Sequence, residues 1–328
     1  MRGSVLFCLA LATAWGAASH ASVVVAEGRF ESTAPAWSPD GRLIAYVIRK
    51  GSDRDLWVVG ANGKNARRLA SGVARGSEAE WAPDSGRIAI VLGKPKPDLV
   101  VLQIAGTEGP VSLEEKLRLP CWRPDGRALA ATDGKDVFLA DLAGKTAPLT
   151  HEATPGVFHG LAWSPDGKWI ASDRNGDISI VPARKGATWR VVASHGAGAS
   201  APLRSPIFSA DGRFIYYTID RAGVYDAAAG SDGIGRVDLV VGKAEVVCEG
   251  ASWSLGGSNL ALERGGSVWV RNMGTGKERE VARGSLPALS GDGGSLAYVV
   301  ESDTNGDGRI DFRDRRQLVV AEIGDGGT

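Results

Sequence analysis

The chain has 328 residues, with 38 Lys and Arg against 38 Asp and Glu, so its formal net charge is zero. This balance excludes a general nucleic-acid binder, which needs surplus positive charge to displace counterions from phosphate. Hydrophobic residues at 43% and charged residues at 23% match an ordinary globular protein rather than a disordered chain or a bundle of membrane helices. The 45 Gly, 15 Pro and 10 Trp indicate many tight turns and few long helices.

The first 21 residues have the pattern of a secretory signal peptide. Met1-Arg2 is a short basic start, residues 5–18 form an apolar run, and Ser19-His20-Ala21 places small residues where a signal peptidase cleaves. A membrane anchor is the alternative, but the run is shorter than the ~20 residues that a spanning helix needs. We therefore expect cleavage after Ala21 and a periplasmic or secreted protein whose mature chain has no transmembrane segment.

Seven copies of one short motif follow along the rest of the chain. The first four contain Trp, Pro and Asp and lie at residues 37–41, 81–86, 122–126 and 163–167; weaker copies lie at 208–212, 253–257 and 289–293. Successive copies start 36 to 45 residues apart. This spacing is typical of four-stranded propeller blades, which repeat every ~40–50 residues.

Each motif reads as a hairpin turn between two β-strands. Pro fixes φ, Asp accepts hydrogen bonds from nearby amides, and Gly adopts a positive φ. In the first copy, apolar runs follow at residues 43–47 and 55–59, and a shorter outer run follows at 67–72. The sequence therefore predicts an all-β protein made of units of four antiparallel strands.

The last unit needs a strand from the other end of the chain. The sequence stops soon after the third strand of the seventh unit, whereas residues 23–28 share the pattern of the outer strand at 246–250. We expect this N-terminal strand to complete the last blade, so that no edge strand stays open. Six blades and a stray repeat are the alternative, which would leave these runs unpaired. We predict one seven-bladed β-propeller over residues 22–328.

The Trp-Ser-Pro-Asp-Gly-x-x-Ile-Ala pattern resembles the repeat of TolB-type propellers, which also occurs in the propeller domains of prolyl-oligopeptidase-type enzymes. The resemblance covers about residues 22–328 and is more specific for fold than for function. TolB proteins carry a further α/β domain, and the peptidases carry a hydrolase domain with a Gly-x-Ser-x-Gly elbow, which this sequence lacks. The resemblance therefore implies a stand-alone exported propeller.

A calcium-loop motif lies between the second and third strands of the seventh unit. Residues 303–314 place oxygen atoms at the spacing of a twelve-residue calcium loop, with glycine at the sixth position. Asp at the last position resembles dockerin-type loops. A polar surface turn is the alternative, but its carboxylates would repel one another without a cation. We expect one structural calcium ion, with these ligands: Asp303, Asn305, Asp307, Arg309 (through its carbonyl), Asp311 and Asp314.

A polar ring at the mouth of the central channel is a second candidate site. The residues four positions before the aromatic (or Leu) residue of each motif are all polar: Thr33, Ser77, Arg118, His159, Arg204, Glu249 and Ser285. We expect them on the innermost strands, where Arg118, His159 and Arg204 could bind an anionic ligand and Glu249 would limit the positive region. Exposed strand starts are the alternative. The long excursion at 220–235 is either a mobile loop or a rim for partner contact.

The sequence contains no recognisable catalytic constellation. The mature chain has three His, of which only His159 falls in the register of the innermost strands. We therefore expect a monomeric, non-catalytic scaffold that binds an envelope or extracellular protein or an anionic ligand. The alternative is a propeller enzyme of lyase or lactonase type with its site at the channel mouth. Cys121 and Cys248 are expected on blades too far apart for a disulfide, both free and largely buried.

Overall fold

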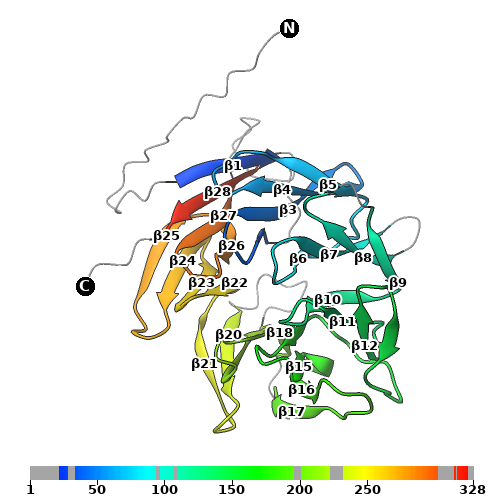
Figure 1. Ribbon diagram of the computed structural model, residues 1–328. Helices are drawn as coiled ribbons and strands as arrows, with labels where there is room; N and C mark the ends of the chain where they lie inside the picture. The colour runs from blue at the N-terminus through cyan, green and yellow to red at the C-terminus, as the bar shows by residue number, and fades with distance from the viewer. Residues whose placement is uncertain are drawn as a thin grey trace.

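The computed structural model describes residues 22–28, 34–93, 97–106, 109–195, 201–221, 232–301, 314 and 316–323. These residues form seven antiparallel sheets of four strands each. The sheets stand around a common axis as the blades of a β-propeller (Figure 1). The predicted all-β fold with seven blades is confirmed, and the six-bladed alternative is wrong. The predicted signal peptide at 1–21 lies outside the described residues.

The strands follow one another blade by blade. The first three blades contain β2 (Ala36–Trp37), β3 (Leu43–Lys50), β4 (Asp53–Gly60) and β5 (Arg67–Ser71); β6 (Glu80–Trp81), β7 (Arg87–Leu92), β8 (Asp98–Gln103) and β9 (Val111–Glu115); and β10 (Arg118–Trp122), β11 (Ala128–Thr132), β12 (Val137–Asp141) and β13 (Thr146–Pro148). The fourth and fifth contain β14 (Leu161–Trp163), β15 (Trp169–Ser172), the 3-10 turn η1 (Arg174–Gly176), β16 (Ile178–Pro182) and β17 (Arg190–Ala193); and β18 (Leu203–Phe208), β19 (Phe214–Ile219), β20 (Gly233–Asp238) and β21 (Lys243–Glu249). The sixth contains β22 (Ala251–Gly256), β23 (Asn259–Arg264), β24 (Ser267–Asn272) and β25 (Glu278–Arg283), and the seventh contains β26 (Ser285–Leu289), β27 (Ser295–Glu301), β28 (Arg316–Glu322) and β1 (Ser22–Gly28).

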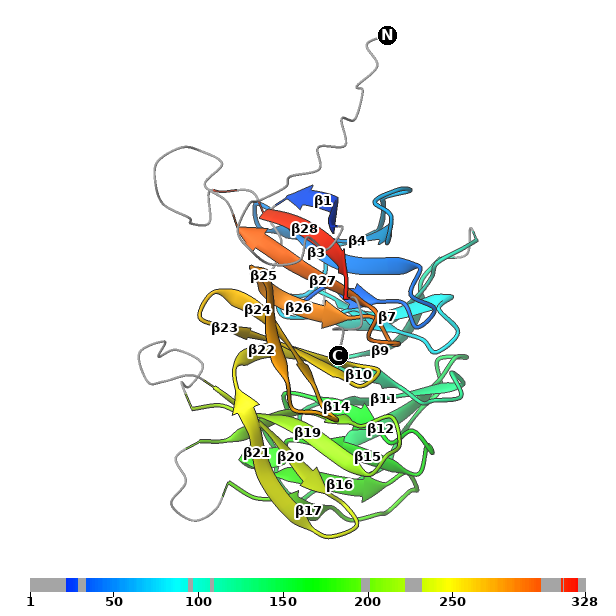
Figure 2. The same ribbon diagram turned by 90° about the vertical axis from the view of Figure 1, so that its left-hand side faces the viewer.

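The N-terminal strand closes the ring as predicted. β1 pairs antiparallel with β28, placing Ser22 opposite Ala321 and Val24 opposite Val319. Figure 2 shows the two strands side by side at the edge of the seventh blade. Val25 is buried and joins an apolar cluster that contains residues of the first and the last blade. The two ends of the chain thus hold the ring together by backbone pairing and by apolar packing.

The Pro-Asp-Gly turns use their side chains as predicted. In the first blade the Ser38 hydroxyl donates to Asp40 Oδ1 at 2.6 Å, and the Arg42 amide donates to the same oxygen at 3.1 Å. Gly41 has a φ of +68°, which a side chain would strain. The carboxylate therefore bridges the two ends of the turn and fixes the start of β3.

Several motif tryptophans tie neighbouring blades together, a role that the repeat pattern alone did not indicate. Trp81 Nε1 donates to the Ala36 carbonyl of the preceding blade at 2.9 Å, and Trp37 Nε1 donates to Ala288 at the same distance across the ring closure. Trp122 Nε1 likewise donates to the Glu80 carbonyl at 3.0 Å. Each bond satisfies a buried indole N–H, so the aromatic ring can pack at the blade interface.

Apolar side chains fill the spaces between the blades. One cluster joins the first and second blades through Val47, Leu56 and Ile88, and others repeat this arrangement around the ring. The sheet of each blade packs face to face against the sheets of its two neighbours. The first strand of each blade lies nearest the axis, and its polar end therefore lies there too. In the described part of the chain, no helix has the length and apolar character needed to cross a membrane.

The two described cysteines are free, as predicted. Cys121 on β10 is buried and Cys248 on β21 is half-buried. Burial raises the pKa of the Cys121 thiol well above its ordinary value and that of Cys248 to about 11. We expect slow reaction of both with a thiol reagent in the native protein, because thiolate is the reactive form, and full reaction after denaturation. Thiols that stay unreactive in denaturant would contradict this prediction.

Candidate functional site

One end of the ring carries the candidate site. In each blade the innermost strand runs away from this end and the second strand returns to it, so strand entries and second-to-third hairpins share one face. We call it the entry face and define it by the connection at 157–160 and the hairpin at 173–177. The Pro-Asp-Gly turns lie on the opposite face.

His159 and Asp173 form a fixed pair at the start of the fourth blade. His159 Nδ1 lies 3.0 Å from Asp173 Oδ2, and Asp173 Oδ1 accepts the amides of His159 at 2.8 Å and of Gly160 at 3.1 Å. The Asp173 side chain is fully buried, whereas 36% of the His159 side chain is exposed. The carboxylate therefore orients the imidazole, with Nδ1 as its donor and Nε2 as the acceptor.

Arg204, from the next blade, faces His159. Arg204 Nη1 contacts His159 Nε2, and because a guanidinium only donates, Nε2 must accept. Arg204 Nε lies 2.5 Å from Asp220 Oδ2, so the arginine is also held by a buried carboxylate. The structure thus brings two predicted residues, His159 and Arg204, into one array that runs from Asp173 through His159 and Arg204 to Asp220.

Bulges in the innermost strands position the ring residues. The register of the first strand pair shifts just after Arg118, Arg204 and Ser285. The residues that follow them have positive φ: Leu119 at 54°, Ser205 at 51° and Leu286 at 53°. Such a conformation strains a non-glycine residue by about 1–3 kcal/mol. Its repetition at one register indicates that these blades hold the preceding side chain in a set direction.

Arg118 and Glu249 do not join the array. Arg118 is exposed, and its guanidinium lies so close to Gly134 of its own blade that a Cβ there would collide with it. Glu249 was predicted to lie on an innermost strand, and this prediction is wrong. It is the last residue of β21, the outer strand of the fifth blade, where it pairs with Arg221 at 3.5 Å. The expected convergence of Arg118, His159 and Arg204 is therefore reduced to His159 and Arg204.

The other ring residues differ in placement. The Ser77 hydroxyl accepts the amide of Val91 at 3.0 Å and so serves its own blade. Ser285 starts β26 and is half-buried, and Thr33 lies outside the described residues.

Sequence reasoning missed Asp173, and it noted Asp220 only as the start of the excursion at 220–235, not as part of this site. Both follow the last residue of a second strand, β15 or β19, and the second strands of the sixth and seventh blades likewise end near Glu263 and Glu301. Glu263 accepts the amide of Leu286 in the next blade at 3.2 Å, much as Asp173 accepts that of Ser205 at 3.4 Å. An acidic residue ten to twelve positions after the motif aromatic was the available signal.

A second His–Asp pair lies on the outer part of the fourth blade. His195 Nδ1 is 2.7 Å from Asp177 Oδ1, which also accepts the Ser194 hydroxyl at 2.9 Å. The His195 side chain is 36% exposed, like that of His159. No described residue bonds to His195 Nε2. The two histidines have the same exposure but differ in two respects: an arginine faces the second ring nitrogen of His159 only, and the Asp177 side chain is 27% exposed whereas that of Asp173 is fully buried.

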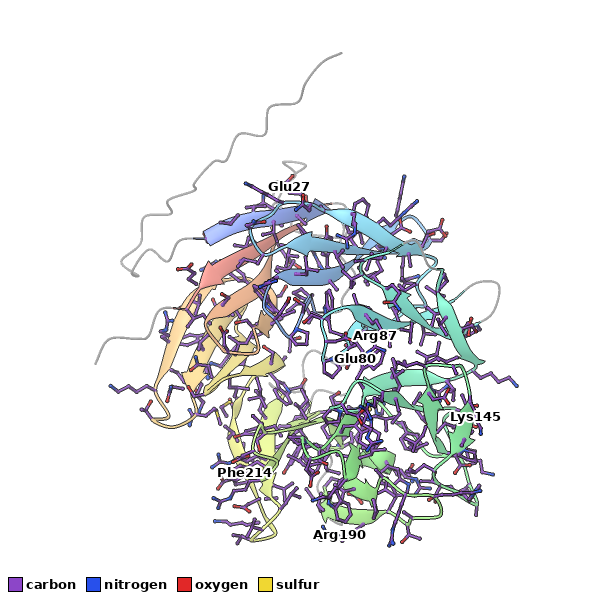
Figure 3. The ribbon with its side chains drawn as sticks, viewed as in Figure 1. Glu27, Glu80, Arg87, Lys145, Arg190 and Phe214 are labelled. Carbon is purple, nitrogen blue, oxygen red and sulfur yellow. The ribbon has the colours of Figure 1, made fainter. Side chains whose placement is uncertain are left out.

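Glu80 is the unusual residue at a deeper level of the ring. Its register, one before the motif aromatic, is otherwise occupied by small or apolar residues: Ala36, Cys121, Ala162, Ile207, Ser252 and Ala288. Figure 3 shows Glu80 on the inner side of its blade, while Lys145 and Arg190 lie at the periphery. Burial and then the neighbouring Glu78 carboxylate raise the pKa of Glu80 to about 8. This carboxyl is therefore mostly protonated at neutral pH.

Glu80 makes stability depend on pH. Folding raises the pKa of Glu80 from 4.5 to about 8. Below about pH 4.5 the carboxyl is protonated in both states and does not change the free energy of unfolding. As the pH rises from there through about 8, ionisation of Glu80 progressively lowers the free energy of unfolding. We expect Glu80→Gln to be more stable than wild type at high pH, by about 2–4 kcal/mol, with the difference vanishing at low pH. Urea unfolding across this range measures it, with the exposed Glu322→Gln as control. A pH-independent difference would refute the prediction.

Most of the predicted calcium loop cannot be compared with the structure. Asp303, Asn305, Asp307, Arg309 and Asp311 lie outside the described residues, and Asp314 is buried just before β28. Among the described residues, no group of three or more His, Cys, Asp or Glu could hold a metal ion. The calcium site stays a prediction.

Known structures share this architecture. An oligogalacturonate lyase in complex with manganese superimposes with a TM-score of 0.67 over 94% of this chain and 95% of that one, at 14% identity. A second oligogalacturonate lyase, from Vibrio parahaemolyticus, gives 0.65 over 92% of each chain at 11% identity. TolB from Acinetobacter baumannii gives 0.53 at 18% identity, over 86% of this chain and 64% of that one. This chain has a TolB-like β-propeller fold.

Two curated proteins are similar in sequence. An uncharacterized peptidase of Bacillus subtilis, YuxL, is 26% identical over 215 residues, and an uncharacterized protein of Agrobacterium fabrum is 30% identical over 157 residues. These matches cover 61% and 44% of this chain, and the chain spans only 31% and 50% of the two relatives. No protein-family model matches the sequence.

The comparisons correct the functional expectation. We expected a non-catalytic scaffold, yet two of the propellers that align over more than nine tenths of the chain are lyases, and one sequence relative is named a peptidase. The expectation that the chain is not an enzyme is contradicted in the same way. Catalytic groups are defined by their arrangement in space, so the lack of a linear catalytic motif did not exclude an enzyme. The alternative of a propeller enzyme is better supported than the scaffold.

Proposed function

We propose that this protein is a propeller lyase that cleaves an acidic oligosaccharide at the centre of the entry face. The observation that carries the proposal is the array of Asp173, His159, Arg204 and Asp220 at this position. It combines an oriented imidazole with a cation, and these are the groups that elimination next to a carboxylate requires. The two oligogalacturonate lyases with the same fold support a uronate-containing substrate.

His159 serves as the base. Nε2 takes the proton from the carbon next to the substrate carboxylate, and the electron pair left behind forms a carbon–carbon double bond while the neighbouring glycosidic C–O bond breaks. The imidazolium then returns its proton to the departing oxygen, so that protons and charge balance. Buried Asp173 holds the ring in this orientation and stabilises the imidazolium.

Arg204 serves as the carboxylate-binding group. Removal of the proton moves negative charge onto the substrate carboxylate, and a guanidinium can donate two parallel hydrogen bonds to it. Asp220 keeps Arg204 at the axis side of the fifth blade. A neutral sugar offers this arginine no anion, so the site favours uronates over neutral oligosaccharides.

Manganese is bound in one of the similar lyases, but the described residues here do not fit a metal at this position. His159 Nδ1 donates to Asp173, and Nε2 faces a guanidinium, whose charge opposes a metal cation. No third ligand lies near enough to complete a metal group among the described residues. We therefore derive no step through a metal.

We also propose that residues 303–314 bind one structural calcium ion. Asp307→Ala should abolish one equivalent of calcium binding, because it removes a central carboxylate ligand. A chelator should lower the melting temperature of the wild type but not of the variant, since a ligand stabilises only a fold that binds it. The absence of bound calcium at about millimolar concentration, which still saturates weak sites, would contradict this proposal.

An activity assay tests the lyase proposal. Purified mature protein is incubated with oligogalacturonate, with its methyl ester and with a neutral oligosaccharide, and ultraviolet absorbance follows the conjugated double bond of the product. We expect absorbance to rise with oligogalacturonate and not with the neutral sugar. Cleavage that yields only saturated ends would indicate hydrolysis, and no cleavage of any uronate-containing substrate would refute the proposal.

A further inference from the structure

The contact between Arg204 and His159 blocks the atom that the reaction needs. A neutral imidazole has one lone pair, on Nε2 here, because Nδ1 donates to Asp173. Arg204 Nη1 donates to that same lone pair. In this arrangement His159 is well oriented but cannot accept a proton from substrate.

Arg204 is also incompletely satisfied where it lies. Its Nε is within ion-pair distance of Asp220 Oδ2 but is buried without an aligned hydrogen-bond acceptor among the described residues. Its backbone is followed by the strand bulge at Ser205, which sets the direction of the side chain. A carboxylate at the axis would offer the guanidinium a better-aligned, charge-assisted acceptor than the imidazole does.

We propose that Arg204 is a specificity-determining cap on His159, which only an anionic substrate removes. When a substrate carboxylate takes the guanidinium, His159 Nε2 becomes free at the moment the substrate is in place. A neutral or esterified substrate leaves the cap on and the base blocked. This inference rests on the proposed function for its consequence, but the cap itself is measurable without turnover.

His195 provides an internal control for the cap. Diethyl pyrocarbonate acylates a free imidazole lone pair. The two histidines have equal side-chain exposure, and each has an Asp partner at Nδ1, Asp173 for His159 and Asp177 for His195. We expect His159 in wild type to react about tenfold more slowly than His195, because a charge-assisted hydrogen bond must open first. In Arg204→Gln, His159 should approach the rate of His195, whose own rate stays unchanged. Peptide mapping by mass spectrometry reads both rates in one sample.

The release step is read by nuclear magnetic resonance. In ¹⁵N-histidine-labelled protein, galacturonate should shift the His159 Nε2 resonance toward that of Arg204→Gln, whereas galacturonate methyl ester should leave it in place. The chemical shifts of His159 depend on all the charged groups near it, namely Asp173, Arg204 and Asp220. Unchanged His195 resonances show that the fold is intact.

The two proposals fail separately. Equal acylation of His159 and His195 in wild type, or a His159 resonance that responds to acid and ester alike, overturns the cap even if the enzyme eliminates oligogalacturonate. Slow, arginine-dependent acylation and acid-specific release support the cap even if no elimination is found, in which case the proposed reaction is the part that is wrong.

Discussion

Val25→Asp should destabilise the folded protein by several kcal/mol, whereas Val23→Asp on the same strand should change the free energy of unfolding by less than about 0.5 kcal/mol. Val25 is 6% exposed and packs between the first and last blades, while Val23 is 42% exposed. Burying the Val25 side chain contributes about 1.5–3 kcal/mol, and an unpaired buried charge adds to the loss. Urea unfolding of both variants measures the difference.

Deleting residues 22–28 should have the larger effect. It removes the pairing partner of β28 and leaves an open edge strand, so the mature protein should aggregate or unfold at much lower denaturant concentration. If the truncated protein were as soluble and stable as its parent, or if the two valine variants behaved alike, the ring would not be closed by β1.

His159→Gln should lower kcat on oligogalacturonate by about 10²–10⁴-fold, because glutamine keeps polarity but cannot accept the proton. Stability should change little, since 36% of this side chain is exposed. His195→Gln is the matched control and should retain activity, because its Asp177 pair lies on the outer part of the blade. Initial rates and melting temperatures of the three proteins provide the comparison.

Equal losses in the two histidine variants would mean that His159 has no special role. A loss in His195→Gln alone would move the site from the axis to the outer part of the fourth blade.

Most of the fold could be predicted from the sequence because each repeat contains residues that favour a specific hairpin turn. Ser38, Asp40 and Gly41 form the turn that their types require, and the apolar runs beside them fall in β3 and β4. The closing strand was predictable since residues 23–28 share the pattern of an outer strand. The bond from Trp81 to Ala36 was not, because the repeat marks a tryptophan without showing what its N–H reaches.

The candidate site was predictable only in part. The position four residues before the motif aromatic predicted His159 and Arg204 correctly, because the innermost strands of consecutive blades start at one level. It misplaced Glu249 because only Gly250 separates β21 from β22, so the expected ring position still belongs to the outer strand. Asp173 and Asp220 escaped because they come from second strands. The direction of the Arg118 side chain, toward Gly134 of its own blade, was also not predictable, because sequence spacing gives no information on local side-chain contacts.

The structure of His159→Gln with oligogalacturonate bound tests the central claim most directly. The substituted base should trap uncleaved substrate at the centre of the entry face. We predict a substrate carboxylate on the Arg204 guanidinium, with the neighbouring carbon facing residue 159 and Arg204 withdrawn from that side chain. Oligogalacturonate bound at the periphery of the propeller, or at the axis with its carboxylate away from Arg204, would contradict the account.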